Sequence, residues 1–333
     1  MSIGGDTIRI SFSNAFGMYD LPITGATIAL PSNGSSEDPA INVSTLQTLT
    51  FEGSKNITVP ESALVVSDPI DFPIEPQSEI TVTMYLADGQ QSNDITSHPG
   101  SRATSYISFG DYTHATNMSD PSTQSVTHCW PDLLLRRLQN FSSTSHIAIL
   151  NQAAGGNRIL YDGLGPNTLS RLDRDIFSHP GISYSLLFSG INDIGSTSTS
   201  TSAQTSLLTR LITSYSQIIH RHHLLGIPIF WATLTPFSAP NYNTTIQPYS
   251  SPIRERTRQD LNHWIRNSGK FDLVVDFDPV LRNESVPWQL KEELQSGDYL
   301  HPNVKGYELL AESFPVDELE IWGKDRKVVN GFE

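Results

Sequence analysis

The sequence predicts an α/β fold with a parallel sheet, preceded by an antiparallel β region, and two observations lead to this prediction. Up to about residue 120, short alternating runs are separated by Gly, Pro, Asn and Asp, the pattern of a β-sandwich. After Trp130, helical patterns alternate with short apolar strands, which favours a parallel sheet covered by helices. We therefore expect a β-sandwich domain over residues 1–120, a polar linker over 121–129 and an α/β domain over 130–333.

Several short runs with strand-like composition predict the β region. Each run is rich in Thr, Ile, Val or aromatic residues and ends at turn-forming residues. Strands are expected over residues 7–12, 27–30, 48–51, 63–66 and 80–85.

The second half contains both apolar runs and amphipathic stretches. Strands are expected over residues 146–150, 183–188, 227–233 and 273–277, and helices over 133–138, 166–177, 251–267 and 304–314. Ser251 with Pro252 and then Gly269 are typical start and stop signals for one of these helices. The Ser/Thr-rich residues 196–206 are expected to form a solvated loop. The mixed charges at Arg254, Glu255, Arg256, Arg258 and Asp260 suggest a solvated helix face.

The motif Asp298-Tyr299-Leu300-His301-Pro302 is the most informative local pattern. Three residues of spacing place Asp298 and His301 on one tight turn, and Pro302 suits the first turn of the following helix. A carboxylate beside an imidazole fixes its tautomer and stabilises its charged form, as a general base requires. The alternative is a surface helix start in which Asp298 is only a cap.

Glycine and asparagine follow two of the expected strands. Gly156 comes after the strand at residues 146–150, and Asn192 comes after the strand at residues 183–188. Open α/β sheets collect ligand-binding groups at this end of their strands, where a glycine N–H and an asparagine amide could stabilise an oxyanion. The alternative is that the glycines serve turn geometry and the asparagines cap helices.

In this order, the motifs resemble those of the SGNH, or GDSL-type, hydrolases. Gly156 matches the second block of that family, Gly190-x-Asn192-Asp193 the third, and Asp298-x-x-His301-Pro302 the fifth. The resemblance implies a flavodoxin-like parallel sheet and a Ser-His-Asp mechanism for carboxylic ester hydrolysis, without cofactor or metal. His301 would be the general base, Asp298 its orienting partner, and Gly156 and Asn192 two oxyanion donors. Residues 2–9, 96–102 and 130–134 resemble extracellular two-domain members found in fungi and actinobacteria.

The chain departs from this family at its first block, because no Gly-Asp-Ser occurs anywhere in the sequence. Gly5-Asp6-Thr7, interpreted as a turn before a strand, and Gly110-Asp111-Tyr112 only imitate it. Tyr112 or Thr113 as nucleophile is less favoured than loss of the first strand together with its serine before Trp130. Either an omitted exon in the gene model or a true deletion would explain this loss, and the sequence does not separate the two. The nucleophile is therefore left unassigned. The alternative function is a catalytically dead pseudo-hydrolase that binds carbohydrate.

Composition excludes several other functions. The 333 residues carry a net charge of −14 and a pI near 5.0, which argues against nucleic-acid binding. No apolar run is long enough to span a bilayer. The single cysteine, Cys129, excludes an internal disulfide and lacks a partner for nucleophilic chemistry. His220, His222 and His223 do not share one helix face, so a metal site is disfavoured.

Glycosylation sequons indicate an extracellular location, although the N-terminus lacks the features of a signal peptide. We expect an ester substrate that is a small molecule or a polysaccharide, and the sequence specifies neither the ester nor the oligomeric state. The sequons begin at Asn33, Asn42, Asn56, Asn117, Asn140, Asn243 and Asn283.

Overall fold

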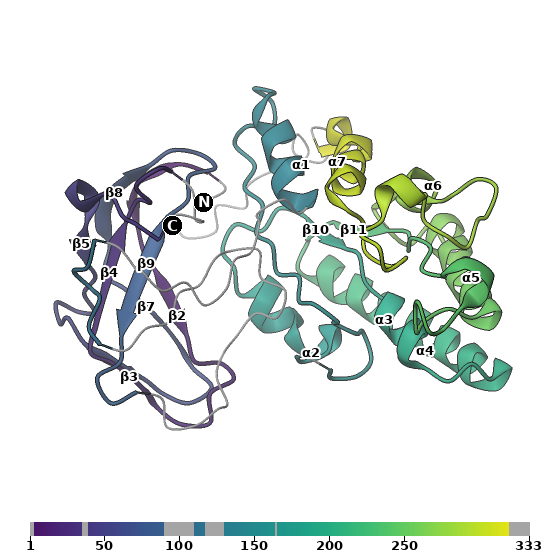
Figure 1. Cartoon of the computed structure of the whole chain (residues 1–333), viewed down its shortest axis with the longest axis horizontal. Coiled ribbons are helices and arrows are strands. Elements are labelled where there is room, and N and C mark those ends of the chain that lie inside the picture. The colour runs from purple at the N-terminus through teal and green to yellow at the C-terminus, as the bar shows by residue number, and fades with distance from the viewer. Residues whose placement is uncertain (1–2, 35–38, 90–109, 117–129, 164, 320–333) are drawn as a thin grey trace. The chain divides into compact units, whose positions relative to one another are not determined.

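The computed structural model describes residues 3–34, 39–89, 110–116, 130–163 and 165–319 (Figure 1). They fall into two compact units, which are described separately. Unit 1 comprises Met1–Thr127 with Ile147–Leu150, and unit 2 comprises His128–His146 with Asn151–Glu333. The expected linker lies outside the described residues.

Unit 1 consists of short strands that pair in small antiparallel sheets. The pairs are β1 (Gly5–Ile8) with β8 (Ile70–Ile74), β2 (Ser11–Ser13) with β7 (Leu64–Val66), and β3 (Leu21–Ile23) with β6 (Ile57–Val59). A further sheet has the order β5 (Gln47–Thr48), β4 (Gly25–Ala29), β9 (Thr81–Tyr85), and η1 (Val43–Thr45) is a single 3₁₀ turn. Residues 5–7, which were expected to form a turn, lie in β1 instead.

The strands of unit 1 share one apolar core because their side chains alternate between core and solvent. In β8, for example, Phe72 and Ile74 are buried whereas Asp71 and Pro73 are exposed. Members of this core come from β2, β3, β4, β6 and β8, so strands of all four sheets contribute to it.

Unit 2 contains a three-stranded parallel sheet. Its order is β10 (Ser185–Leu187), β11 (Ile229–Ala232), β12 (Leu273–Val275), which confirms three of the expected strands. All four residues of β11 are buried, as expected for a strand covered on both faces. The α/β prediction for this half is therefore correct.

The helices of unit 2 follow the strands in the expected alternation (Figure 1). The central crossovers are α3 (Ile191–Ser196) with α4 (Thr201–Leu224), and α5 (Pro252–Asn267). α5 begins and ends where the sequence predicts, with Ser251 as N-cap and Gly269 at φ +63°. The other segments are α1 (Trp130–Gln139), α2 (Thr168–Leu172), the π-turn η2 (Asp173–Phe177), η3 (Pro240–Tyr242), α6 (Asp278–Leu281), η4 (Glu292–Leu294) and α7 (Val304–Ser313). Within the described part of the chain, no helix is both long and apolar enough to cross a membrane.

Two expected local structures are wrong. Residues 201–206 are not loop but the first turns of α4, because the Ser200 side chain caps this helix by accepting a hydrogen bond from Ala203 N. Residues 147–150 form no strand and belong to unit 1. A strand requires a hydrogen-bonding neighbour, and none of the described residues pairs with residues 147–150.

The expected solvated charge face of α5 is also wrong at two positions. Arg258 is fully buried and Glu255 is 3% exposed. Arg258 donates hydrogen bonds to both Glu255 oxygens, at 2.6 and 2.8 Å, and to Asp278 Oδ1 at 2.7 Å. The burial of these charges is possible because they are paired and hydrogen-bonded.

Candidate active site

The turn before α7 brings Asp298 and His301 together as the sequence predicts. Asp298 Oδ2 lies 2.6 Å from His301 Nδ1. The other oxygen, Oδ1, accepts the backbone N–H groups of Leu300 and His301, both at 2.9 Å. The bond fixes Nδ1 as the donor atom of the ring, so Nε2 is the atom that can accept a proton from another group.

Electrostatics keep Asp298 ionised. Partial burial works to raise its pKa, but hydrogen bonds from the His301 ring and from two backbone N–H groups outweigh burial and lower the pKa to about 2. The side chain of His301 is 62% exposed, and its Nε2 has no partner among the described residues. The pair therefore presents an oriented imidazole to whatever lies beside it.

Hydrogen bonds from backbone N–H groups to the Gln295 side chain hold this turn in an uncommon conformation. Tyr299 has φ +59°, and Gln295 Oε1 accepts the N–H groups of Gly297 at 2.6 Å and Tyr299 at 3.1 Å. Asn303 is the N-cap of α7, and its side-chain oxygen accepts a hydrogen bond from Gly306 N at 3.0 Å. Pro302 therefore lies just outside the first turn of the helix. The alternative that Asp298 is only a helix cap is wrong, because Asn303 is the N-cap.

The end of β10 leads directly into the turn that carries Asn192. Gly190 has φ +124°, and a Cβ there would lie 2.3 Å from the Tyr215 hydroxyl, so only glycine fits. Asn192 Nδ2 donates to the carbonyl oxygen of Asn157 at 3.0 Å. Its second N–H has no partner among the described residues and is available to a ligand.

Asp193 connects this turn to the loop that carries Gly156. Its carboxylate is 1% exposed and accepts the N–H groups of Ile159 at 2.8 Å and Leu160 at 3.0 Å. Burial raises the pKa of Asp193, and the two backbone hydrogen bonds oppose that rise. The contact holds the two glycine- and asparagine-containing segments against each other.

The Gly156 loop is itself fixed by Asn157. The Asn157 side chain donates to Pro166 O at 2.7 Å and accepts from the Thr168 hydroxyl at 2.8 Å. Gly156 has φ +69°, and its N–H makes no hydrogen bond among the described residues. Both expected oxyanion donors therefore have an unused N–H on segments that Asp193 and Asn157 join.

Two residues that the sequence did not predict link the segment that carries Asn192 to the turn that carries Asp298 and His301. Tyr249 donates its hydroxyl to Asn192 Oδ1 at 3.1 Å, which fixes the orientation of that amide. Gln247 donates from Nε2 to the carbonyl oxygen of Asp298 at 2.7 Å, and its Oε1 accepts Tyr249 N at 3.1 Å. A continuous hydrogen-bonded path thus runs from Asp298 through Gln247 and Tyr249 to Asn192.

Close packing explains why Tyr249 is held so firmly. A Cβ on Gly195 would lie 2.2 Å from the Tyr249 ring, so the ring occupies the space that a side chain would need. No periodicity in the sequence marks Gln247 or Tyr249, because both lie in an irregular segment after η3.

Several other residues have structural roles. Trp231 and Phe237 are fully buried and pack in the core of unit 2. His222 is buried and bonds Ile218 O through Nδ1, and burial lowers its pKa. The part of the chain that the structure covers has no cluster of three or more metal-ligating side chains. Thr113 lies in unit 1 and donates its hydroxyl to Asp111 Oδ1 at 2.6 Å.

One family model and several solved structures are similar to this chain. The model of the GDSL-like lipase/acylhydrolase family matches residues 100–314. A G-D-S-L family protein from Desulfitobacterium hafniense DCB-2 is 17% identical over 58% of this chain and 89% of its own, with a TM-score of 0.42. An acetylxylan esterase from Geobacillus stearothermophilus is 18% identical over 64% of this chain and 84% of its own, also with a TM-score of 0.42. No curated protein matches the chain.

The family match spans Gly156, Asn192 and the turn that carries Asp298 and His301. The chain therefore belongs to the GDSL-like lipase/acylhydrolase family, whose members are hydrolases that act on ester bonds.

Proposed function

We propose that unit 2 is the framework of a carboxylic-ester hydrolase that uses a serine acyl-enzyme mechanism, and that this chain lacks the serine. His301 would be the general base, Asp298 would orient it, and Gly156 N–H and Asn192 Nδ2 would stabilise the oxyanion. The observation that carries this proposal is the hydrogen-bonded path from Asp298 through Gln247 and Tyr249 to Asn192.

The chemistry requires each of these groups in a defined state. The ionised Asp298 stabilises the imidazolium that forms when His301 Nε2 takes a proton from a nucleophile. The unused N–H groups of Gly156 and Asn192 would then stabilise the negative charge of a tetrahedral intermediate. The intermediate collapses by expelling the alcohol, and water next releases the acid, with His301 moving the proton in both steps.

The nucleophile would come from the family's first block, and the sequence, which contains no Gly-Asp-Ser, supports its absence. On the flavodoxin-like topology that the resemblance implies, with strand order 2-1-3-4-5, β10, β11 and β12 would be the last three strands. Loss of one triad member leaves only the residual catalysis of oxyanion hole and binding, ~10³–10⁴-fold over water.

Hydrolysis of p-nitrophenyl acetate tests the proposal with three proteins. They are the chain itself, His301→Ala, and a variant in which an apolar strand ending in Gly-Asp-Ser, with a Gly/Asn-rich loop, is inserted before Trp130. We expect equal rates for the first two, no fluorophosphonate labelling of either, and a gain of about 10³-fold or more on insertion.

Two results would contradict it. His301-dependent hydrolysis by the chain itself, with a fluorophosphonate label mapped by mass spectrometry, would identify a nucleophile that the proposal denies. A folded insertion variant without activity would refute the hydrolase framework and favour the alternative, a pseudo-hydrolase that binds carbohydrate.

We also propose that unit 1 is a β-sandwich, which its shared core of strands from four antiparallel sheets supports. An extracellular location is a further proposal, and the accessibility of the sequons supports it. A loss of apparent mass when the protein from a secreting eukaryotic host is treated with peptide N-glycosidase would test the location, and no loss would count against it. Five of the sequon asparagines in the described residues are exposed: Asn33, Asn42, Asn56, Asn140 and Asn243.

A further inference from the structure

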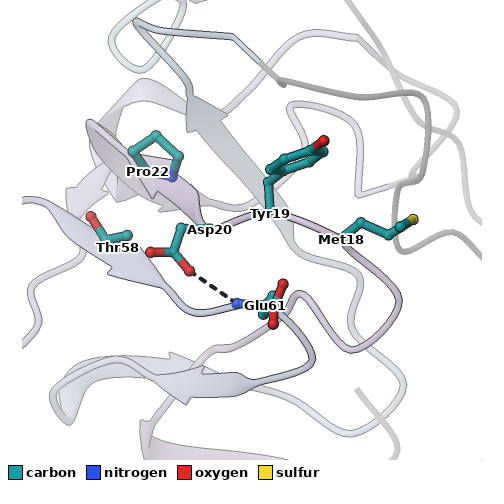
Figure 2. A pocket seen from close by; sticks show the side chains of 6 residues that line it. All are labelled: Met18, Tyr19, Asp20, Pro22, Thr58 and Glu61. Atoms are coloured by element: carbon teal, nitrogen blue, oxygen red, sulfur yellow. Dashed lines mark hydrogen bonds between the residues drawn. The ribbon is translucent and has the colours of Figure 1, made fainter.

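Unit 1 carries a shallow pocket on the outward face of the strand pair β3–β6 (Figure 2). Its volume is about 420 Å³. It lies entirely within unit 1, so it is separate from the candidate active site of unit 2. Its lining residues are Met18, Tyr19, Asp20, Pro22, Thr58 and Glu61.

The strand register explains how these residues come together. Pro22 of β3 lies directly opposite Thr58 of β6 in the antiparallel pair, and neither is buried, so both face the solvent side. Tyr19 and Asp20 immediately precede β3, and Glu61 follows β6. Both rims of the pocket are therefore chain segments that leave the same strand pair.

A buried asparagine holds the two rims in place. Asn14 is 1% exposed, and its Nδ2 donates to Tyr19 O at 2.8 Å, Pro60 O at 3.1 Å and Val59 O at 3.2 Å. One side chain thus bonds the backbone next to each rim. A second tie runs from Glu61 N to Asp20 Oδ1 at 3.2 Å, drawn as a dashed line in Figure 2. The pocket is preformed rather than assembled by its ligand.

The lining combines an exposed aromatic ring with unused acceptors. Tyr19 is 53% and Met18 62% exposed. Among the described residues, the Tyr19 hydroxyl, the Thr58 hydroxyl and the Glu61 carboxylate make no hydrogen bond. Asp20 uses one oxygen for Glu61 N and retains the other.

We propose that this pocket binds a neutral oligosaccharide. The ring of Tyr19 and the thioether of Met18 offer apolar, polarisable surface for the C–H face of a sugar ring. The Asp20 and Glu61 carboxylates accept strong hydrogen bonds from sugar hydroxyls. A net charge of −14 disfavours anionic polysaccharides. This inference goes beyond the proposed function, because it concerns unit 1 and holds with or without catalysis in unit 2.

Isothermal titration calorimetry of the full chain with xylohexaose and cellohexaose tests the proposal. The protein is produced in a bacterial host, because Thr58 belongs to the sequon at Asn56 and an attached glycan would compete for the pocket. Hexagalacturonate and a chitosan hexamer serve as anionic and cationic comparisons. Circular dichroism verifies that each variant is folded.

We expect saturable binding of at least one neutral hexamer, and its affinity should not depend on the salt concentration. Tyr19→Ala should weaken it by about ten-fold or more, and Glu61→Gln by about three- to ten-fold. The matched controls are Phe141→Ala, an aromatic side chain 50% exposed in unit 2, and Glu75→Gln, an exposed carboxylate outside the pocket. Both control variants should bind the neutral hexamer as tightly as the unmodified chain does.

Three results would overturn the proposal. One is a folded chain that binds neither neutral hexamer. Another is binding that the pocket variants and the control variants affect equally. The third is a preference for the chitosan hexamer that disappears in about 0.5 M salt. Because salt screens interactions between charges, this result would identify a cation site instead.

Discussion

Replacing Arg258 by methionine should destabilise unit 2 by about 3–5 kcal/mol, because it leaves a buried carboxylate without its cation. Glu255 is 3% exposed, and without Arg258 its carboxylate keeps only Gln259 Nε2, at 2.8 Å, as a side-chain partner. Asp278 is less affected, since Arg266 and Arg282 each donate to its Oδ2 at 2.8 Å. The cost therefore comes mainly from Glu255.

A second substitution separates the unpaired charge from the loss of packing. Arg258→Met with Glu255→Leu removes both charges and keeps apolar volume, which is often nearly neutral for a buried pair. The carbonyl oxygen of Leu234 still loses its bond from Arg258, 2.8 Å long, at a cost of about 1 kcal/mol. We expect the double variant to lose about 1–2 kcal/mol, less than the single variant.

Urea unfolding followed by tryptophan fluorescence measures these differences. All five tryptophans lie in unit 2, so the signal reports that unit. The control is Arg256→Met on the same helix, whose side chain is 84% exposed and 3.8 Å from Asp260, and whose expected cost is below about 1 kcal/mol. The reasoning fails if Arg258→Met costs no more than the control, or if the double variant is less stable than the single one. The tryptophans are Trp130, Trp231, Trp264, Trp288 and Trp322.

Three further predictions concern the candidate active site. Gly195→Ala should cost about 1–3 kcal/mol in urea unfolding, because its Cβ would lie 2.2 Å from the Tyr249 ring; an unchanged midpoint would contradict this. Tyr249→Phe removes the donor to Asn192 Oδ1 and should lower the free energy of unfolding by about 0.5–1.5 kcal/mol. An unchanged free energy of unfolding would contradict this prediction. The pKa of Asp298, about 2, lies below its ordinary value of 3.8, so its carboxylate stabilises the folded chain above that value. The stability difference from Asp298→Asn, below about 1 kcal/mol because the side chain is partly exposed, should disappear as pH falls toward 2. A difference that grows in acid would refute the sign.

Local chemistry made the ends of α5 and the Asp298–His301 pair predictable. A cap, a proline and a glycine act within a few residues, and the i, i+3 pair lies on one turn. Gln247 and Tyr249 were not predictable, because their partners Asp298 and Asn192 lie 51 and 57 residues away and only the fold brings them together.

The buried charges of α5 illustrate the same limit. By sequence, Arg258 and Glu255 look like any i, i+3 surface pair. Their burial depends on Asp278, 20 residues away, and on the Leu234 carbonyl at the end of β11. Similarly, residues 196–206 were expected to be loop because Ser and Thr favour caps, and the Ser200 cap in fact begins a 24-residue helix.

The residues around Tyr112 bear on whether the proposed nucleophile could be supplied by a point substitution. In a sheet of order 2-1-3-4-5, the first strand pairs with both the second and the third, and the nucleophile of this family stands at its end. A serine at Tyr112 would keep Gly110 and Asp111 in sequence, yet these residues belong to unit 1, where Asp111 already accepts from Thr113. Such a serine would belong to unit 1, whereas Asn192 and His301 belong to unit 2. Under the proposed function, strand and serine would therefore be restored together, and the insertion, rather than a substitution, is the decisive variant.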